Sequence, residues 1–387
     1  MDNVKKMIGQ VFEDIATGLE TGSLGGRVKV GLTLLGSELG EAELLRGAEL
    51  AQAEDPSIEV VVIGTPPTPT ALTHIEAPDE EAAHKKMDEL LQSGELAVAV
   101  TLHYSFPIGV STVGRVLTPA LGRKVYIANT TGTSDTDRVA AMLKNVIAGI
   151  ATAKACGNPS PTVGLLNLDG ARGVERALKK LQDGGYELHF SESARADGGA
   201  VMRGNDLLQG VADVMVMDSL TGNVMIKMLS AYQSGGSYEA IGDGYGPGVG
   251  AGYDRIIGII SRASGAPVIA GAIRYMAACA RGDLLEKVRT EFEAAKRAGL
   301  DAILASLAEA NKPAPGDAAP SVPPPPEKVV TEEIPGIEIL VLEDAVQVLW
   351  QKSIYATSGM GCTGPIVLVA PDDLDAALQI LKETEFL

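Results

Sequence analysis

A cysteine in a glycine-rich segment is the clearest chemical feature of this sequence. Residues 358–365 spell SGMGCTGP, so Cys362 stands between Gly361 and Thr363. Backbone N–H groups of a glycine-rich turn approach a reacting atom closely, which lowers the pKa of a thiol and favours binding of an oxyanion. The pattern suits a thiol that accepts an acyl group. It is also typical of a small apolar residue that fills a tight turn.

A second candidate site lies where a predicted strand turns into a helix. Residues 213–227 spell DVMVMDSLTGNVMIK, an apolar strand followed by a polar turn and a helix start. N–H groups and side-chain donors at a helix N-terminus favour anions, and residues four apart share one helix face. The candidate phosphate or substrate ligands are Asp218, Thr221, Gly222, Asn223 and Lys227. The alternative is an ordinary capped helix with a surface lysine, in which Asp218 shapes the turn.

The remaining polar segments suggest structural roles. The turn at residues 129–137 contains two aspartates and a capping pattern, and the glycine-rich residues 242–252 match a dinucleotide fingerprint only loosely. Cys156 and Cys279 are interpreted as structural. The four histidines have no metal-ligand spacing, so we expect neither a metal site nor a cofactor.

These candidates stand in a chain that alternates between strands and helices. Near-continuous apolar strands favour a parallel sheet covered on both faces, that is, an α/β fold. We expect strands at 28–35, 58–64, 96–102, 125–129, 162–167, 187–191 and 214–217. We expect helices at 4–15, 41–53, 79–92, 137–154, 173–183, 222–232 and 284–307.

The clearest boundary is a proline-rich linker at residues 311–328, NKPAPGDAAPSVPPPPEK. It divides the chain into an N-terminal α/β half (1–150), a second α/β half with the anion-site turn (151–310), the linker, and a small cysteine-bearing unit (329–387). In that last unit we expect a strand at 337–342, a glycine-rich loop, a strand at 366–369 and a helix at 372–384. The linker's extended reach of about 50 Å would let the unit move between two positions.

Composition limits the possible partners. The 387 residues carry a net charge of −18, and 45% are hydrophobic. This acidity argues against nucleic acid or an anionic membrane surface as a partner. With no signal peptide, no apolar run of membrane-spanning length and three cysteines, the sequence predicts a cytoplasmic protein.

Three pieces of the chain resemble the phosphate acyltransferases of phospholipid synthesis. They are VGLLN at 163–167, the Asn129/Gly132 turn, and the strand with TGNVMIK that ends at Lys227. Over nearly its full length the chain is similar to the alpha subunits of component C of glycine/sarcosine/betaine reductase. That resemblance includes GLTLLGSELGEAELLRGAELA and SGMGCTGPIVLVAP. The lipid-synthesis enzymes lack the proline linker and the final unit, which favours the reductase subunits.

The resemblance implies a three-layer body like that of phosphate acyltransferases and phosphotransacetylases. It implies that a two-carbon unit arrives as an acetyl thioester on Cys362 and that phosphate releases it as acetyl phosphate. The implied partners are the beta subunit of component C, selenoprotein A and inorganic phosphate, within an oligomer. Two alternatives stay open. One is a lipid-synthesis enzyme that makes acyl phosphate from acyl carrier protein without an essential cysteine, and the other is a non-catalytic phosphate-binding scaffold.

Overall fold

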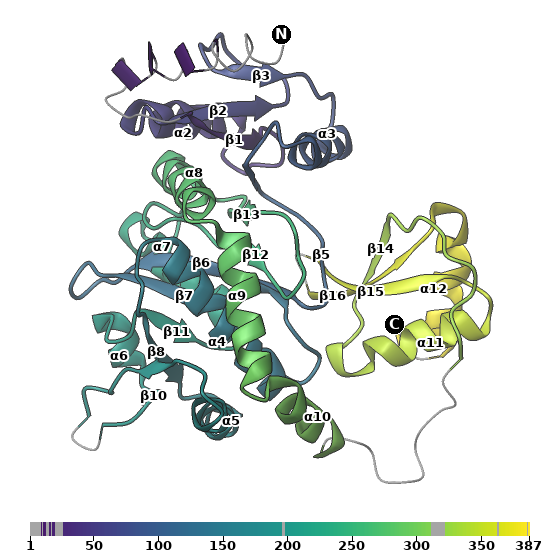
Figure 1. Ribbon diagram of the computed structural model, residues 1–387. Helices are drawn as coiled ribbons and strands as arrows, with labels where there is room; N and C mark the ends of the chain where they lie inside the picture. The colour runs from purple at the N-terminus through teal and green to yellow at the C-terminus, as the bar shows by residue number, and fades with distance from the viewer. Residues whose placement is uncertain are drawn as a thin grey trace.

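A large body and a small C-terminal unit make up the protein (Figure 1). The computed structural model describes residues 26–195, 198–310, 322–361, 364–384 and 386–387, together with 9, 11, 12, 15, 16, 18 and 19. Within these residues, twelve strands form one sheet in the body and four strands form a second sheet. The α/β fold class is confirmed. The helix expected at 4–15 lies largely outside the described residues, as do the first eleven residues of the proline-rich linker.

The N-terminal half of the body sheet is parallel. Its strands are β1 (Val28–Thr33), β2 (Ile58–Ile63), β3 (Thr73–Ile75), β4 (Val98–Thr101) and β13 (Ile257–Ile259). Alternate strand residues face opposite sides, so Val60 and Val62 pack with helices α2 (Glu41–Glu54) and α8 (Ala266–Arg281). Val61 and Ile63 pack with α3 (Glu80–Ser93) on the other face. The strands and helices expected between residues 28 and 102 are confirmed.

The second half of the body sheet is also parallel and covered on both faces. Its strands are β7 (Lys124–Thr133), β8 (Thr162–Leu166), β9 (His189–Phe190), β10 (Val201–Met202) and β11 (Val214–Val216). The helices on one face are α4 (Arg138–Ala155), α5 (Ala171–Asp183) and α9 (Leu284–Arg297). The helices on the other face are α6 (Gly204–Gln209) and α7 (Ser219–Ala231), which begins three residues before the expected start.

Two antiparallel strands join these halves. They are β6 (Val110–Leu117), which the sequence did not predict, and β12 (Gly246–Val249). The glycine-rich residues 242–252 are not a loop throughout, because the buried strand β12 lies inside that segment. Its first residue, Gly246, has φ 82°, and a Cβ there would lie 1.8 Å from the Val113 carbonyl oxygen. Glycine therefore lets two backbones pass at close range.

Three further expectations were wrong. The long helix at 284–307 is two helices, α9 and α10 (Leu300–Ala310), separated at Gly299 with φ 103°. The strand at 337–342 is a 3-10 turn, η2 (Ile339–Val341), that leads into helix α11 (Leu342–Gln351). Leu342, Ala345, Val346 and Leu349 are all buried, which is a helical period. The glycine-rich loop is a hairpin of β15 (Ala356–Gly361) and β16 (Gly364–Val369).

The C-terminal unit docks on the body through a shared sheet. Its order is β14 (Glu332–Pro335), β16, β15 and finally β5 (Phe106–Pro107), which the body supplies. Helices α11 and α12 (Leu374–Glu383) cover this sheet. Asp373 directly precedes α12, but its carboxylate accepts from Lys328 Nζ at 2.5 Å and caps no helix N–H. The division of the chain at residues 150 and 310 stays a prediction.

Candidate functional site

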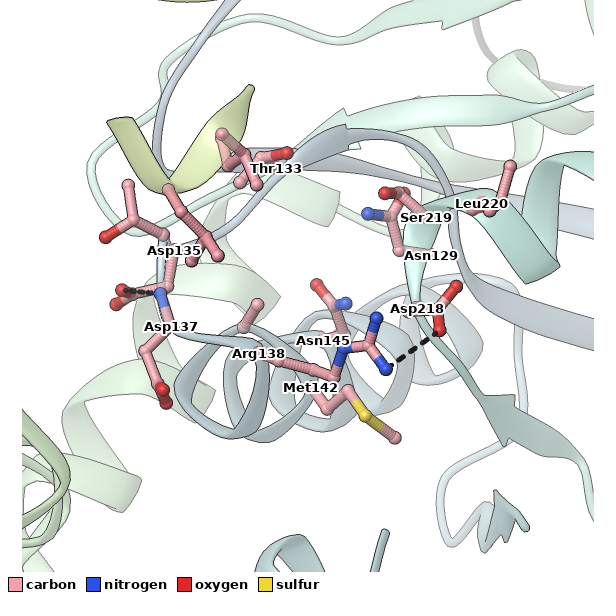
Figure 2. Close-up of a pocket in the computed structure, with 14 residues that line it drawn as sticks. Asn129, Thr133, Asp135, Asp137, Arg138, Met142, Asn145, Asp218, Ser219 and Leu220 are labelled. Carbon is pink, nitrogen blue, oxygen red and sulfur yellow. Dashed lines mark hydrogen bonds and ion pairs between the residues drawn. The ribbon is translucent and has the colours of Figure 1, made fainter. Parts of the chain in front are cut away.

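A pocket of about 690 Å³ lies between the body and the C-terminal unit. Its body side comes from the ends of the neighbouring parallel strands β7 and β11 and from the helices that follow them, α4 and α7 (Figure 2). Ile339 and Leu340 of η2 form the opposite side. The carboxyl ends of adjacent parallel strands are the usual position of ligand sites in α/β sheets. The body residues that line it are Asn129, Thr133, Asp135, Thr136, Asp137, Arg138, Ala141, Met142, Asn145, Asp218, Ser219 and Leu220.

The carboxylates of the pocket are held by local partners. Asp137 caps α4 by accepting from Ala140 N at 2.7 Å, and Asp218 caps α7 by accepting from Thr221 N at 2.8 Å. Asp135 accepts from Lys144 Nζ at 2.6 Å. These contacts explain why three aspartates occur beside one pocket: two start helices and one forms an ion pair.

An anion in the pocket would meet two kinds of positive group. The Arg138 guanidinium is half exposed and lies 3.9 Å from the nearer Asp218 oxygen, as the dashed line in Figure 2 marks. The backbone N–H groups of Ser219 and Leu220 belong to the first turn of α7, where an α-helix provides no acceptor for them. Together with the helix dipole they offset part of the negative charge of the aspartates.

Asn129 contributes a buried acceptor to the pocket wall. Its side chain is 3% exposed, and its Nδ2 donates to the Gly132 carbonyl at 3.0 Å. Its Oδ1 has no hydrogen-bond partner among the described residues. A buried carbonyl oxygen without a donor is costly, so a ligand that carries an N–H or a protonated oxygen would be stabilised there.

A bulge in β7 fixes the start of α7. Between Ala128 and Gly132 the strand bulges opposite Thr112, whose Oγ1 accepts from Thr131 N at 3.0 Å. Strand β7 continues to Thr133, so the turn expected directly after Asn129 was wrong. A Cβ on Gly222 would lie 1.6 Å from the Asn129 carbonyl oxygen. Glycine thus lets the first turn of α7 contact the bulge directly.

Asn223 and Lys227 share one face of α7, as their spacing predicted, but they do not line this pocket. Asn223 Nδ2 donates to the Thr130 carbonyl at 3.0 Å, and Lys227 Nζ donates to Tyr245 Oη at 3.0 Å. Thr130 Oγ1 in turn donates to the Tyr245 carbonyl at 2.8 Å. Of the five predicted anion ligands, only Asp218 lies on the pocket wall. The other four belong to the junction between α7 and the strands beneath it.

A buried carboxylate completes that junction. Tyr245 Oη donates to Glu239 Oε1 at 2.7 Å, and Ser264 Oγ donates to Glu239 Oε2 at 3.2 Å. Burial raises the pKa of Glu239, against the lowering effect of the Tyr245 hydroxyl and the Lys227 charge. The chain Lys227–Tyr245–Glu239 therefore links α7 to the core through hydrogen bonds that depend on one another.

Cys362 and Thr363 lie outside the described residues. Gly361 and Gly364, on either side of them, pair as the last rung of the β15–β16 hairpin. One residue earlier, Met360 pairs with Phe106 of β5. The hairpin that leads into and out of the predicted acyl-carrying thiol is thus bound to the body by backbone hydrogen bonds.

Side chains reinforce the docking of this hairpin. Glu333 of β14 lies 3.7 Å from His103 Nε2 and accepts a short hydrogen bond from Ser105. The neighbouring His103 ring, together with the hydrogen bond from Ser105, lowers the pKa of Glu333 against the effect of burial. Ile108 packs against the core of the C-terminal unit. Residues 103–108 therefore form a docking segment.

Sequence reasoning missed several residues of this region. Arg138, Asn145, Ser219 and Leu220 line the pocket, and η2 closes it from a segment more than a hundred residues away. Arg138 follows a predicted helix cap, so its position was detectable in principle. The sequence does not reveal that the strands before α4 and α7, β7 and β11, are neighbours in the sheet. Within the described part of the chain, no group of three or more His, Cys, Asp or Glu side chains is arranged for a metal ion.

No helix in the described ranges is both long and apolar enough to cross a bilayer.

The comparison with protein families gives a match between residues 28–368 and the family model described as "Fatty acid synthesis protein". The chain is 56% identical over 383 residues to the alpha subunit of component C of the glycine/sarcosine/betaine reductase complex of Peptoclostridium acidaminophilum. That alignment covers 99% of both chains.

More distant relatives match parts of the chain. A phosphate acyltransferase of Thermotoga petrophila is 27% identical over 236 residues, which cover 52% of this chain and 68% of the relative. Among solved structures, a branched-chain phosphotransacylase from Enterococcus faecalis V583 is 16% identical with a TM-score of 0.48. It covers 65% of this chain and 99% of its own.

Proposed function

This chain belongs to the fatty acid synthesis protein family, and from that premise we propose that it transfers an acetyl group from a cysteine thioester to phosphate. The acetyl group would be carried by Cys362 and released as acetyl phosphate. The observation that carries the proposal is the docked β15–β16 hairpin, whose paired glycines flank Cys362 beside a body with a ligand-sized pocket. The near full-length similarity to a component C alpha subunit supports the same assignment.

The proposed reaction is a phosphorolysis that balances without a redox step. An oxygen of inorganic phosphate attacks the carbonyl carbon of the Cys362 thioester, and a tetrahedral intermediate forms. The carbon–sulfur bond then breaks, the sulfur leaves as a thiolate, and acetyl phosphate is the product. Backbone N–H groups around Gly361 and Thr363 would bind the oxyanion, and a thiolate would be the acceptor for the next acetyl group.

Phosphate would be held in the pocket by Arg138 and the first-turn N–H groups of α7. Arg138 provides the positive charge, and the Ser219 and Leu220 N–H groups provide donors. Asn129 Oδ1 would accept from the protonated oxygen of the phosphate, which gives this buried atom its partner. Asp218 holds the turn as the helix cap.

The remaining predicted ligands act through this helix. Asn223 and Lys227 fasten α7 to Thr130 and Tyr245, so their role would be to position the N–H groups that face phosphate. Gly222 permits the close contact with the bulge, and the Thr221 N–H is the donor that Asp218 captures. We assign these four residues to positioning rather than to direct ligation.

The upstream steps belong to other proteins. We propose that the chain works inside a reductase complex, with a beta subunit of component C as partner and a selenoprotein A as the source of the two-carbon unit. Those partners would present the acetyl precursor to Cys362, while phosphate enters the pocket from solution. A cytoplasmic location is part of the same proposal.

Exchange of Cys362 tests the proposal. Arsenate-dependent hydrolysis of acetyl phosphate reports acetyl transfer through the thioester, both for the chain alone and for the assembled complex. We expect Cys362→Ala and Cys362→Ser to abolish it, and Cys156→Ala, a matched loss of a remote thiol, to retain it. If both Cys362 variants keep the activity, the thiol is not the carrier. Acyl transfer from acyl carrier protein by these variants would then indicate a lipid-type phosphate acyltransferase.

A further inference from the structure

Two thiols outside the pocket lie in direct contact. Cys156, which directly follows α4, and Cys279, in α8, have their sulfurs 3.8 Å apart although they are 123 positions apart in the chain. Both are free cysteines. Helix α4 has 18 residues, so this pair lies about 27 Å from Arg138 at the pocket end of the helix, at about 1.5 Å per residue. The proposed phosphorolysis makes no use of it.

The surroundings distinguish the two sulfurs. Cys156 is partly exposed, whereas Cys279 is completely buried. A hydrogen bond from the Cys279 thiol, opposed by burial but helped by Arg115 and Tyr126, lowers the pKa of Cys156 to about 7. Burial raises the pKa of Cys279 well above its usual range. Cys156 is therefore the more accessible and more readily ionised of the two thiols, and Cys279 is a buried neighbour whose sulfur lies 3.8 Å away.

The Arg115 charge, which lowers the pKa of Cys156, is fixed in place. Arg115 is buried, pairs with Asp243 at 2.6 Å, and lies 4.1 Å from the centroid of the Tyr275 ring. It cannot turn to solvent without losing both contacts. Arg115 is thus held rigidly, and its charge lowers the pKa of Cys156 while that of its partner Asp243 raises it. The contact with the Cys279 thiol remains the larger influence on Cys156.

We propose that Cys156 and Cys279 are a site of reversible oxidation, at which a hydroperoxide converts the two thiols into an intramolecular disulfide. The Cys156 thiolate attacks the peroxide, the O–O bond breaks, and a sulfenic acid forms while an alcohol or water leaves. The Cys279 thiol then attacks that sulfur, a sulfur–sulfur bond forms, and water leaves with the Cys279 proton. Two thiols are oxidised by two electrons and one peroxide is reduced by two.

The disulfide would join the two halves of the body. Helix α4 packs on β7 and β11 in the second half, whereas α8 packs on α2, β1 and β4 in the N-terminal half. The sulfurs must approach from 3.8 Å to about 2.05 Å, a movement that side-chain rotation and a small helix shift can supply. The disulfide would close a loop between residues 123 positions apart, which restricts the unfolded chain strongly. The oxidised protein should therefore melt about 5 °C higher than the reduced one.

The full-length Cys362→Ala variant tests this directly, because only Cys156 and Cys279 then remain of the three cysteines. The reduced protein is treated with hydrogen peroxide, then unfolded, and its thiols are counted. We expect two thiols before treatment and none after, a monomer that has lost two hydrogens, a peptide pair joined through Cys156 and Cys279, and full reversal by dithiothreitol. The melting temperature should rise with oxidation.

Two matched variants keep the test independent of folding and of Cys362. Cys156→Ser and Cys279→Ala, each in the Cys362→Ala background, should show no rise in melting temperature after peroxide. Persistence of both thiols after treatment, a sulfinic acid on Cys156, or disulfides only between molecules would each overturn the proposal. None of these outcomes bears on acetyl transfer, which the Cys362 variants test separately.

Discussion

Adding a single methyl group at Gly222 probes how α7 is fastened to the sheet. The Cβ of Gly222→Ala would lie 1.6 Å from the Asn129 carbonyl oxygen and 2.8 Å from its carbon. Both are backbone atoms of the β7 bulge, so no side-chain rotation can relieve the clash. The helix must retreat by about 2 Å to reach an ordinary contact distance. That retreat would break the 3.0 Å bond from Asn223 Nδ2 to the Thr130 carbonyl.

The expected cost follows from these two losses. Forcing a methyl group into a filled site costs about 1–3 kcal/mol, and the lost hydrogen bond adds about 1 kcal/mol. We therefore expect Gly222→Ala to lower the free energy of unfolding by about 2–4 kcal/mol. Because the retreating turn carries the N–H groups of Ser219 and Leu220, acetyl transfer should fall by about a hundredfold even in the folded variant.

Urea unfolding and arsenate-dependent hydrolysis of acetyl phosphate measure the two effects. Gly204→Ala is the matched control, because Gly204 also stands in a first helical turn and a Cβ there would meet nothing within 4 Å. That variant should unfold within about 0.5 kcal/mol of the parent and keep its activity. If Gly222→Ala behaves like Gly204→Ala, the close contact between α7 and the bulge does not hold the first turn of α7 in place.

Further predictions concern the groups around the site. Desolvation by burial raises the pKa of Asp206, but the hydrogen bonds from Arg203 N, Ser193 and Ala194 N together outweigh it and hold this pKa below the usual 3.8. Asp206→Asn should lower the free energy of unfolding by about 2 kcal/mol at pH about 7. The difference between the parent and the variant should shrink as pH falls below about 3.8, because protonation of the native carboxylate removes its contribution to stability. Urea titrations at both pH values measure this, and a gap that widens in acid would be the wrong sign. Glu333→Gln removes the charge that His103 and Ser105 contact, and since that side chain is 35% exposed we expect a loss of no more than about 1 kcal/mol. The loss should appear as faster hydrogen exchange at Met360 N in Glu333→Gln than in a Glu338→Gln control. Equal exchange rates in the two variants would mean that β5 alone docks the C-terminal unit. Tyr245→Phe leaves Glu239 short of a donor and should cost about 2 kcal/mol in a thermal or urea melt. It should slow acetylation of Cys362 by acetyl phosphate without abolishing it, because Lys227 of α7 loses its hydrogen-bond acceptor. An unchanged labelling rate in the folded variant would count against a positioning role.

Elements that bury one continuous apolar face could be predicted from the sequence. Strands β1, β2 and β4 and helices α2, α3 and α4 begin within two residues of their expected positions. Strand β6 escaped prediction because it carries polar residues whose partners are distant. Arg115 is buried there only because Asp243, 128 positions away, neutralises it. The hydrophobic periodicity of a single sequence cannot reveal such a distant ion pair.

The prediction for the C-terminal unit was wrong for a different reason. The run from Ile337 to Trp350 is apolar enough for either a strand or a helix, and only packing decides between them. Its helix α11 buries Leu342 and Leu349 against the hairpin sheet, which overrides the strand interpretation. The docking strand β5 has two residues, too few for any pattern to reveal.

The pocket could be predicted only in part. Asp218 was identified from its place between a strand and a helix, whereas Arg138 and Leu340 come from segments that no spacing rule connects to it. Their proximity depends on the pairing of β7 with β11 and on the docking of the C-terminal unit. Sites assembled between units are therefore the part of this protein that sequence patterns describe least.

Covalent trapping shows directly whether Cys362 carries the acetyl group. The protein would be incubated with labelled acetyl phosphate, quenched in acid to preserve thioesters, digested and mapped by mass spectrometry. We expect one labelled peptide, which contains Cys362 and loses its label to hydroxylamine. The Cys362→Ser variant should form no labelled thioester. Label on Cys156 or Cys279, or acetyl transfer to arsenate with no labelled cysteine at all, would contradict this role of Cys362.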